Sequence, residues 1–364
     1  MSTAVEYTAQ AASPLVNGEV KIKIGKNGLT ATALFDVVDI PFAEMNELII
    51  ADYVVTIKAD SGDYVFSRMG NWCEPFYDAL CGVYNEAVLR SFFIKDKPLL
   101  TAKGVVPVHV YENCVVTLPP DLSARRIPLC FVSGMDRAGL ELTLTLDTAE
   151  SYSFAKLGYD TEPFADVVEK QIRILREQTI SAAKVIDHSL GTAEASQIAK
   201  LTPKGAAAPF KRIGAIAPSF VSALEEKLAG TCACESYDVF KELCDPEAIY
   251  IGFNEDILWL IAPSPDGNFA AVEFATEDTA TFVYRTCGDF ENFAKQLNRA
   301  LEAIDFKREV IRLSDEELKK PDNADYYMAA KRTEALQFIR KNYVCRVIHS
   351  GVDAWKRKLL ESFK

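Results

Sequence analysis

Hydrophobic positions alternate with polar ones in short stretches of this chain, and each stretch ends at a turn signal. The leucines of the segment 140–146 alternate strictly with polar residues, which is the two-residue period of a strand with one buried face. Turn-forming residues at 60–63 (Asp-Ser-Gly-Asp) join two such stretches, and 147–150 holds the equivalent place further along. The pattern predicts a β-hairpin at both places.

A helical apolar period follows each hairpin. Three amphipathic helices are predicted, with apolar faces at Phe76, Leu80, Val83, Tyr84 and Ala87, then Phe164, Val167, Val168, Ile172 and Leu175, then Phe293, Leu297, Ala300, Leu301 and Ile304. A Glu-Pro pair opens the first two helices, where Pro loses no hydrogen bond and Glu complements the dipole. We expect Phe76, Phe164 and Phe293 to be buried, each against its own sheet.

These elements belong to an internal repeat. The segments 64–70 (Tyr-Val-Phe-Ser-Arg-Met-Gly) and 152–158 (Tyr-Ser-Phe-Ala-Lys-Leu-Gly) are both followed, at the same spacing, by Glu-Pro-Phe. A weaker third copy ends at Gly288 and is one residue shorter after the glycine. We expect Gly70, Gly158 and Gly288 at equivalent places, between the last strand of a sheet and a helix packed across that sheet.

Several short strands ending in one long helix resemble the pleckstrin-homology-like domains of bacteria. The likeness is carried by 40–42 (Ile-Pro-Phe), 52–55 (Asp-Tyr-Val-Val), 64–70 and the helix from Glu74. The resemblance implies an α+β fold of tandem modules, each a bent antiparallel sheet capped by a C-terminal helix, plus a helical C-terminal region. It also implies binding rather than catalysis. Trp72 precedes the first helix, whereas the eukaryotic domains usually place a tryptophan inside it.

The same reading divides the chain into segments. We expect a mobile tail at 1–16, the first module at 17–100 and the second module at 104–180. An Ala/Pro/Gly linker is expected at 181–218, helices with a partial third module at 219–310, and a basic helical region at 311–364. In the last segment, 314–317 (Ser-Asp-Glu-Glu) is a capping box that opens a helix, and further helices are predicted at 326–341 and 352–363.

Composition limits the class of protein. The 364 residues carry a formal net charge of −12, which opposes binding to a nucleic-acid backbone. No apolar run reaches the length of a transmembrane helix, and the N-terminus lacks the pattern of a signal peptide. The nine cysteines are dispersed, as is typical of reduced thiols in the cytoplasm, where we expect the protein to be.

Catalytic motifs are missing from the sequence. There is no glycine-rich nucleotide loop, no G-x-S-x-G elbow and no H-E-x-x-H helix, and the three histidines are isolated from one another. Cys232, Cys234 and Cys244 form the one cysteine cluster, which lacks an evident fourth zinc ligand, so we expect buried or half-buried thiols. The sequence thus predicts no cofactor, no metal and no catalytic residue.

Two groups of cations are candidate binding residues in the modules. Lys21, Lys23 and Lys26 surround the first turn, where a pleckstrin-homology-like module could meet an anion, although alternating lysines are also normal on a solvated strand. Arg68 and Lys156 occupy one slot of the repeat. Either they bind a ligand on each module, or they are cations at the end of a strand that lie near the acidic residue of the following helix.

The C-terminus offers a third group. Residues 331–364 hold nine Lys and Arg against three Asp and Glu, a net charge of +6, which leaves −18 on the remainder. Trp355 lies on an apolar helical face beside Lys356, Arg357 and Lys358. Such a helix can lie on an anionic membrane or in a partner's groove. We expect it instead to pack on its own chain, or on a second copy, with Trp355 mostly buried.

These observations favour a non-enzymatic binding or scaffolding protein that acts through protein–protein contacts of its modules. The first alternative is a peripheral membrane binder that uses the first module and the basic C-terminal helix. The second is an enzyme of a type without a known motif.

Overall fold

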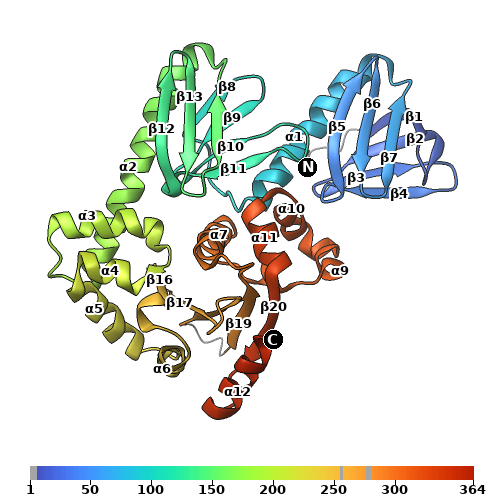
Figure 1. The fold of residues 1–364 in the computed structure, drawn as a ribbon. Helices are drawn as coiled ribbons and strands as arrows, with labels where there is room; N and C mark the ends of the chain where they lie inside the picture. Colours follow the sequence, from blue (N-terminus) through green and yellow to red (C-terminus); the bar gives the residue numbers. More distant parts are fainter. Residues whose placement is uncertain (1–5, 255–256, 276–279) are drawn as a thin grey trace. The chain divides into compact units, whose positions relative to one another are not determined.

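The computed structural model describes residues 6–254, 257–275 and 280–364. It is a mixed α and β fold, as expected, with antiparallel sheets and, within those ranges, twelve α-helices (Figure 1). The chain forms two compact units. The first contains the described residues up to Tyr111, Val115–Ile127 and Ala303–Gln337, and the second contains Glu112–Cys114, Pro128–Glu302 and Phe338–Lys364. No helix in the described ranges is long and apolar enough to cross a membrane.

A seven-stranded antiparallel sheet forms the first unit's core. Its strands are β1 Glu6–Ala12, β2 Asn17–Ile24, β3 Gly28–Thr32, β4 Val37–Pro41, β5 Met45–Ala51, β6 Val54–Ala59 and β7 Gly62–Ser67. They lie in the order β4-β3-β2-β1-β7-β6-β5, and the helix α1 Cys73–Ser91 follows. The turn predicted at 60–63 joins β6 to β7.

The predicted mobile tail is wrong from residue 6 onward, and residues 1–5 lie outside the described ranges. Strand β1 pairs with both β2 and β7, so it lies inside the sheet. Tyr7, Ala9 and Ala11 are buried on one face, and the ring of Tyr7 lies 5.0 Å from that of Phe76. The strand was missed because alanine contributes little to a hydrophobic pattern even where its alternation is complete.

The repeat is visible in the strand order. The second copy contains β8 Leu100–Lys103, β9 Pro107–Val110, β10 Cys114–Thr117, β11 Arg125–Pro128, β12 Val132–Ala138, β13 Glu141–Leu146 and β14 Ser151–Phe154, followed by α2 Thr161–Ile186. Its sheets have the orders β11-β10-β9-β8 and β12-β13-β14, which match β4-β3-β2-β1 and β5-β6-β7. The segment predicted as one module at 104–180 is nevertheless divided, because β8, β9 and most of β10 and β11 belong to the first unit and β12–β14 to the second.

The three repeat glycines lie where the repeat predicts. Gly70, Gly158 and Gly288 have φ values of 55°, 58° and 77°. Gly70 and Gly158 separate the last strand of their copy from its helix, and Gly288 lies between the strand that ends at Arg285 and the helix that begins at Phe290, although one further strand joins the third sheet later in the chain. This left-handed backbone conformation favours glycine because a side chain carries a steric cost there. The prediction for the first helical phenylalanine is also confirmed, since Phe76, Phe164 and Phe293 are fully buried.

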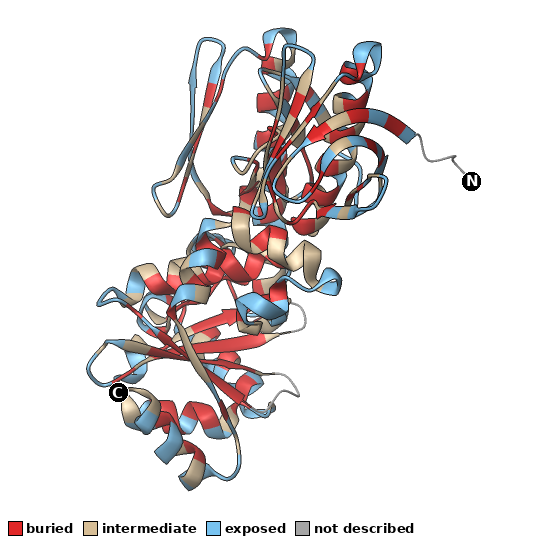
Figure 2. Ribbon diagram, turned by 90° about the vertical axis from the view of Figure 1, so that its right-hand side faces the viewer, coloured by how far each residue is buried: buried red, intermediate tan, exposed pale blue. Residues whose placement is uncertain are grey.

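The third copy is larger than the partial module predicted at 219–310. It is a six-stranded antiparallel sheet of β15 Ala208–Pro209, β16 Tyr250–Phe253, β17 Leu258–Pro263, β18 Phe269–Phe274, β19 Ala280–Arg285 and β20 Tyr343–Ile348. The helix α7 Phe290–Ala303 packs on one face, where the rings of Tyr284 and Phe293 lie 5.5 Å apart. The central strands are buried on both faces (Figure 2).

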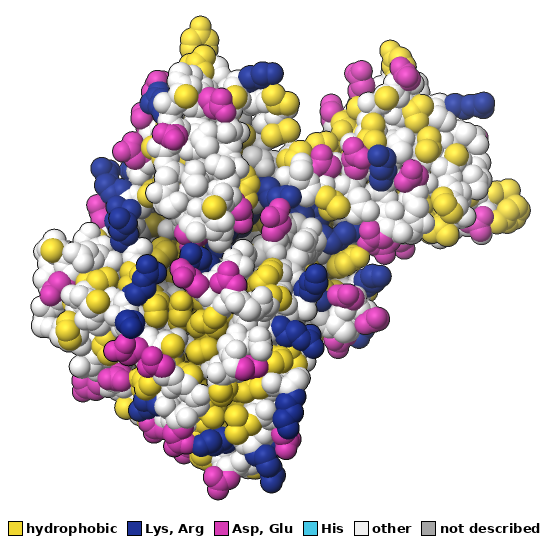
Figure 3. All heavy atoms as spheres, viewed as in Figure 1, with side chains coloured by type: hydrophobic (Ala, Val, Ile, Leu, Met, Phe, Trp, Pro, Cys, Tyr) yellow, Lys and Arg dark blue, Asp and Glu magenta, His cyan; other side chains and the backbone are white. Residues whose placement is uncertain are grey.

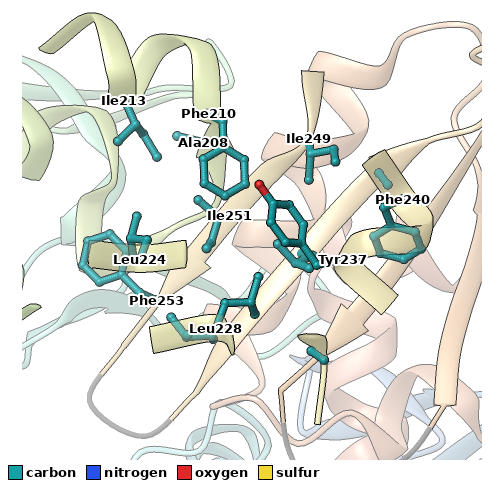
Figure 4. Packing of buried hydrophobic residues seen from close by; sticks show 14 of the residues in the cluster. Ala208, Phe210, Ile213, Leu224, Leu228, Tyr237, Phe240, Ile249, Ile251 and Phe253 are labelled. Atoms are coloured by element: carbon teal, nitrogen blue, oxygen red, sulfur yellow. The ribbon is translucent and has the colours of Figure 1, made fainter. Parts of the chain in front are cut away.

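Helices cover the opposite face of this sheet. They are α3 Thr192–Leu201, α4 Phe210–Ile216, α5 Pro218–Ala229, α6 Cys234–Leu243 and α12 Val352–Ser362. Figure 4 shows Phe210 and Tyr237 facing each other over the strand that carries Ile251 and Phe253, and the two rings lie 5.7 Å apart. Apolar packing therefore fixes these helices on the strands.

The predicted linker at 181–218 is wrong, because this segment is part of the second unit's core. Ala206, Ala207 and Ala208 are buried. The side chain of Asn298 on α7 donates to the carbonyl of Ala207 at 3.0 Å and accepts from its N–H at 2.9 Å. Small side chains let the backbone approach α7 this closely, and the same small side chains make the segment look like a linker.

The C-terminal region at 311–364 is not one region. It contains α9 Asp315–Leu318, opened by the predicted capping box of Ser314 and Glu317, then α10 Ala324–Arg332, α11 Glu334–Asn342, β20 and α12. The predicted helix at 326–341 is thus interrupted at Thr333, and β20 was not predicted. Residues 303–337, which also hold α8 Glu309–Arg312, belong to the first unit, and the rest belongs to the second.

Candidate functional site

The outer edge of β4 is open. This strand ends the seven-stranded sheet and pairs there with β3. The N–H of Phe42 donates to Asn27 O at 2.9 Å, and the N–H of Ala33 donates to Asp36 O at 2.7 Å. Because hydrogen-bonded residues alternate along an antiparallel pair, this register turns the backbone groups of Val37 away from β3, and those of Asp39 likewise. Both residues present an N–H and a C=O to a further strand.

The opposite edge of the same sheet is partly covered. On β5, Leu48 N donates to Pro120 O at 2.8 Å, and Glu47 forms an isolated antiparallel bridge with Asp121. Proteins cover or disrupt sheet edges because an open edge pairs readily with another chain. The contrast between the two edges makes β4 the candidate for an intermolecular contact.

The turn that enters β4 carries an exposed apolar group, which we call the finger: Leu34, Phe35 and Val37. These side chains are 85%, 91% and 66% exposed. Hydrophobic side chains gather at the outer end of β3 and β4 in the space-filling view (Figure 3). Adjacent exposed apolar side chains on a stable turn are typical of a contact surface. The hydrogen bond from Thr30 Oγ1 to Asp39 Oδ1, at 2.6 Å, holds the register of the two strands.

An apolar groove lies at the other end of β4. Its volume is about 350 Å³, and its lining includes Leu29, Ile40 and Pro41 from the sheet and Leu318, Pro321, Ala324 and Tyr327 from the C-terminal segment of the same unit. Lys319 and Lys320 also line it and are exposed. The edge strand therefore runs between two apolar features, the finger and the groove.

Specific polar contacts hold the C-terminal wall of the groove. Asp60 accepts from Tyr327 Oη at 2.7 Å and from Lys331 Nζ at 2.9 Å. Burial alone would raise the pKa of Asp60, but the hydrogen bonds from Lys331, Asn46 and Tyr327 outweigh it and lower that pKa. Arg332 is buried and donates to the hydroxyl of Tyr84 on α1. The wall is thus tied to both the sheet and the helix.

The lysines predicted at the first turn do not converge on a pocket. Lys21 and Lys23 bind Glu6, at 3.0 Å and 3.3 Å, and these hydrogen bonds lower the pKa of the Glu6 carboxyl. Lys26 is exposed, and its carbonyl accepts from Arg90 at 3.2 Å. The partner Glu6 comes from the strand that was read as a tail. An anion site at this turn gains no support from these contacts.

Arg68 and Lys156 share a backbone conformation, with φ values of 59° and 60°. Both are exposed, whereas Tyr64 and Phe66 of the preceding strand are buried. Arg68 therefore does not lie on the buried face that carries these aromatics, because its left-handed backbone redirects the chain. Glu162, the acid at the start of the helix that follows Lys156, contacts Arg137. The turn between strand and helix therefore explains why Arg68 and Lys156 occupy equivalent positions in the repeat.

The C-terminal helix packs on its own unit, as predicted. Trp355 is 2% exposed and its indole lies against Phe240 and His349. Lys356 contacts Glu242, and Arg357 and Lys358 are exposed. Of the cysteine cluster, Cys234 and Cys244 are half-buried, but Cys232 is exposed, contrary to expectation.

The finger was missed in the sequence although it leaves a signal there. The run Ala33-Leu34-Phe35 continues an apolar pattern into a turn, where polar residues are usual. The groove leaves no such signal, because its two walls are nearly 300 residues apart.

Comparisons with known proteins find similar chains among the solved structures. No family model matches the chain, and no curated protein matches it either. Among solved structures, a chain of "Structure of the Spt16D Pob3N heterodimer" is similar over 42% of this chain and 96% of its own length, with 14% identity and a TM-score of 0.19.

Proposed function

We propose that this chain is a non-enzymatic binding protein that takes an extended segment of a partner protein onto the edge of β4. The observation that carries the proposal is the open edge with the finger beside it. A partner strand would pair with the backbone groups of Val37 and Asp39 and cover Leu34 and Phe35. This mode of recognition derives affinity from main-chain hydrogen bonds and specificity from alternate side chains.

The expected energies fit a reversible contact. Each main-chain hydrogen bond contributes about 0.5–1.5 kcal/mol net, and burying a leucine or phenylalanine contributes about 1.5–3 kcal/mol. Ordering of the bound segment offsets part of this gain. A partner side chain in the groove would add apolar contact.

The strand order supports a more specific assignment of fold. Seven strands followed by a helix occur twice, with matching orders in both copies. We propose that these copies are tandem pleckstrin-homology-like modules that act in the cytoplasm. The third copy departs from that pattern, since its sheet has six strands, all in chain order, and its last strand β20 follows α7 instead of preceding it.

The membrane alternative is less well supported. That alternative requires the apolar face of α12 to contact the membrane. In this structure Trp355 and Leu359 on that face are buried. The finger has Asp36 and Asp39 beside it, which repel an anionic lipid surface. A protein segment fits these charges better.

Peptide selection against the 364-residue chain tests the proposal. Selected peptides should bind in extended form, and Phe35→Ser or Asp39→Pro should weaken them at least tenfold. Proline removes the outward N–H of Asp39, whereas the matched Asp39→Asn keeps it and should bind nearly as well as the wild type. Leu140→Ser removes another exposed leucine and should have no effect. Peptides that bind all four variants equally would contradict the proposal.

A further inference from the structure

The second unit contains a cationic cavity that is separate from the β4 edge. Its volume is about 300 Å³, and its walls come from α2, α3, α4, α7 and the segments at 130–133 and 203–204. Five cations line it: Arg176, Lys200, Lys204, Arg212 and Lys295. Lys and Arg side chains gather beside α2 and α3 in the space-filling view (Figure 3). Cations that line one cavity repel one another, and an anion bound among them would relieve that repulsion.

Three of these cations have no acidic partner. Arg176 on α2, Lys200 on α3 and Arg212 on α4 are exposed, and no carboxylate of the described ranges lies within salt-bridge distance of any of them. They come from three helices that the core fixes in place. Their charges therefore meet at the cavity without compensation from the protein.

Lys204 is positioned by its backbone. Its φ is 54°, a left-handed value that costs free energy for a residue with a side chain. The N–H of Lys204 donates to Thr179 Oγ1 at 3.1 Å, and the next residue, Gly205, passes so close to Phe253 O that a Cβ there would lie 1.3 Å from it. The ammonium group of Lys204 contacts the buried Glu302 at 3.5 Å. The loop is rigid where it borders the cavity.

The charges of the cavity are not balanced. Lys204 contacts Glu302, Lys295 contacts Glu291 at 3.2 Å, and Asp147 is the one carboxylate among the residues that line the cavity. Five cations thus face three carboxylates. A neutral complex requires a ligand with about two or more negative charges.

We propose that this cavity binds a compact phosphate-bearing anion. A phosphate group offers three acceptor oxygens and up to two charges, which suits donors that approach from three helices. The two guanidinium groups can each bind phosphate oxygens in a bidentate manner, and the lysines add point charges. A volume near 300 Å³ is at the lower end of small-molecule sites, so the ligand is a small metabolite or two linked phosphates.

Isothermal titration calorimetry with inorganic pyrophosphate tests this site in the 364-residue chain. Binding is expected in wild type, and Arg176→Gln and Arg212→Gln should each weaken it at least tenfold. The matched controls are Arg173→Gln on α2 and Lys211→Gln beside Arg212, which lie outside the lining and should change affinity less than twofold. Thermal unfolding without ligand shows whether each variant is folded.

Three outcomes would overturn the proposal. The first is that millimolar pyrophosphate gives no heat of binding. The second is that the control variants weaken binding as much as Arg176→Gln and Arg212→Gln. The third is that citrate binds as tightly as pyrophosphate, which would mean that the cavity selects charge rather than phosphate. Binding of a phosphate monoester as well as pyrophosphate would support the proposal and show that one phosphate group is enough for recognition. The site is independent of β4, so Phe35→Ser should leave pyrophosphate binding unchanged.

Discussion

The indole Nε1 of Trp355 donates a hydrogen bond of 3.0 Å to Oγ1 of Thr281, and this contact ties α12 to β19. Thr281 donates in turn to Glu273 on β18 at 2.6 Å, and His349 Nε2 lies 3.1 Å from the same hydroxyl. A tryptophan that looked able to meet a membrane is thus part of a buried polar network. The charged residues around it remain outside.

Deleting residues from Val352 onward should destabilise the second unit with little dependence on salt, because apolar burial rather than ion pairing dominates the docking of α12. Trp355→Ala should cost about 3–5 kcal/mol. Urea unfolding at low and high NaCl measures both effects. A loss that disappears in high salt would mean that Lys356 and its neighbours dominate instead.

Phe164→Ala should also lower the free energy of unfolding by about 3–5 kcal/mol, because Phe164 is fully buried in the repeat's second helix. Tyr159→Ala is the matched control from the turn before that helix, where the side chain is fully exposed, and should change stability by less than about 0.5 kcal/mol. Urea melts followed by circular dichroism compare them. Equal losses of stability in the two variants would show that Phe164 is not a core residue.

Asn298→Ala should destabilise the second unit by at least about 2 kcal/mol, since it leaves both backbone groups of Ala207 buried without their partner. Asn292→Ala, on the same helix but only half-buried, should be nearly neutral. Thermal unfolding of the two variants decides whether the segment once read as a linker is held by this contact.

The stability of the first unit should fall at acidic pH through Asp60. Its folded pKa lies below the ordinary value of 3.8, so its contribution is fully present above the unfolded pKa and is lost as the pH falls through the folded pKa. Asp60→Asn should therefore lower stability at pH 7 and flatten its dependence below about pH 5. Asp63→Asn, in the same turn, is the matched control for the loss of one negative charge. Urea midpoints from pH 3 to pH 7 measure this.

The sequence predicts those features that one segment specifies by itself. Gly70 and Gly158 mark a turn that needs a left-handed backbone, and Phe76 and Phe164 begin helices with strong periods. The strand containing Ala9 and the buried Ala207 escaped notice, because small side chains carry little pattern and their burial depends on what packs over them. Strand β20 begins directly after α11 with no turn residues between them, and its place in the sheet is specified by pairing with β19.

The candidate sites could not be predicted for a related reason. The cavity collects Arg176, Lys200 and Arg212 from three helices, and each is unremarkable in its own segment. The edge of β4 depends on which strands end the sheet, and that order depends on β1 being a strand. Only the finger left a local signal.

Backbone amide hydrogen exchange at β4 tests the central proposal most directly. In the free protein, the outward amides of Val37 and Asp39 should exchange much faster than those of Ile40 and Val38, which face β3. With a selected peptide bound, exchange at Val37 and Asp39 should slow at least tenfold, while the edge of β5 stays as it was. Peptide binding that leaves these two amides fast would contradict strand addition at β4.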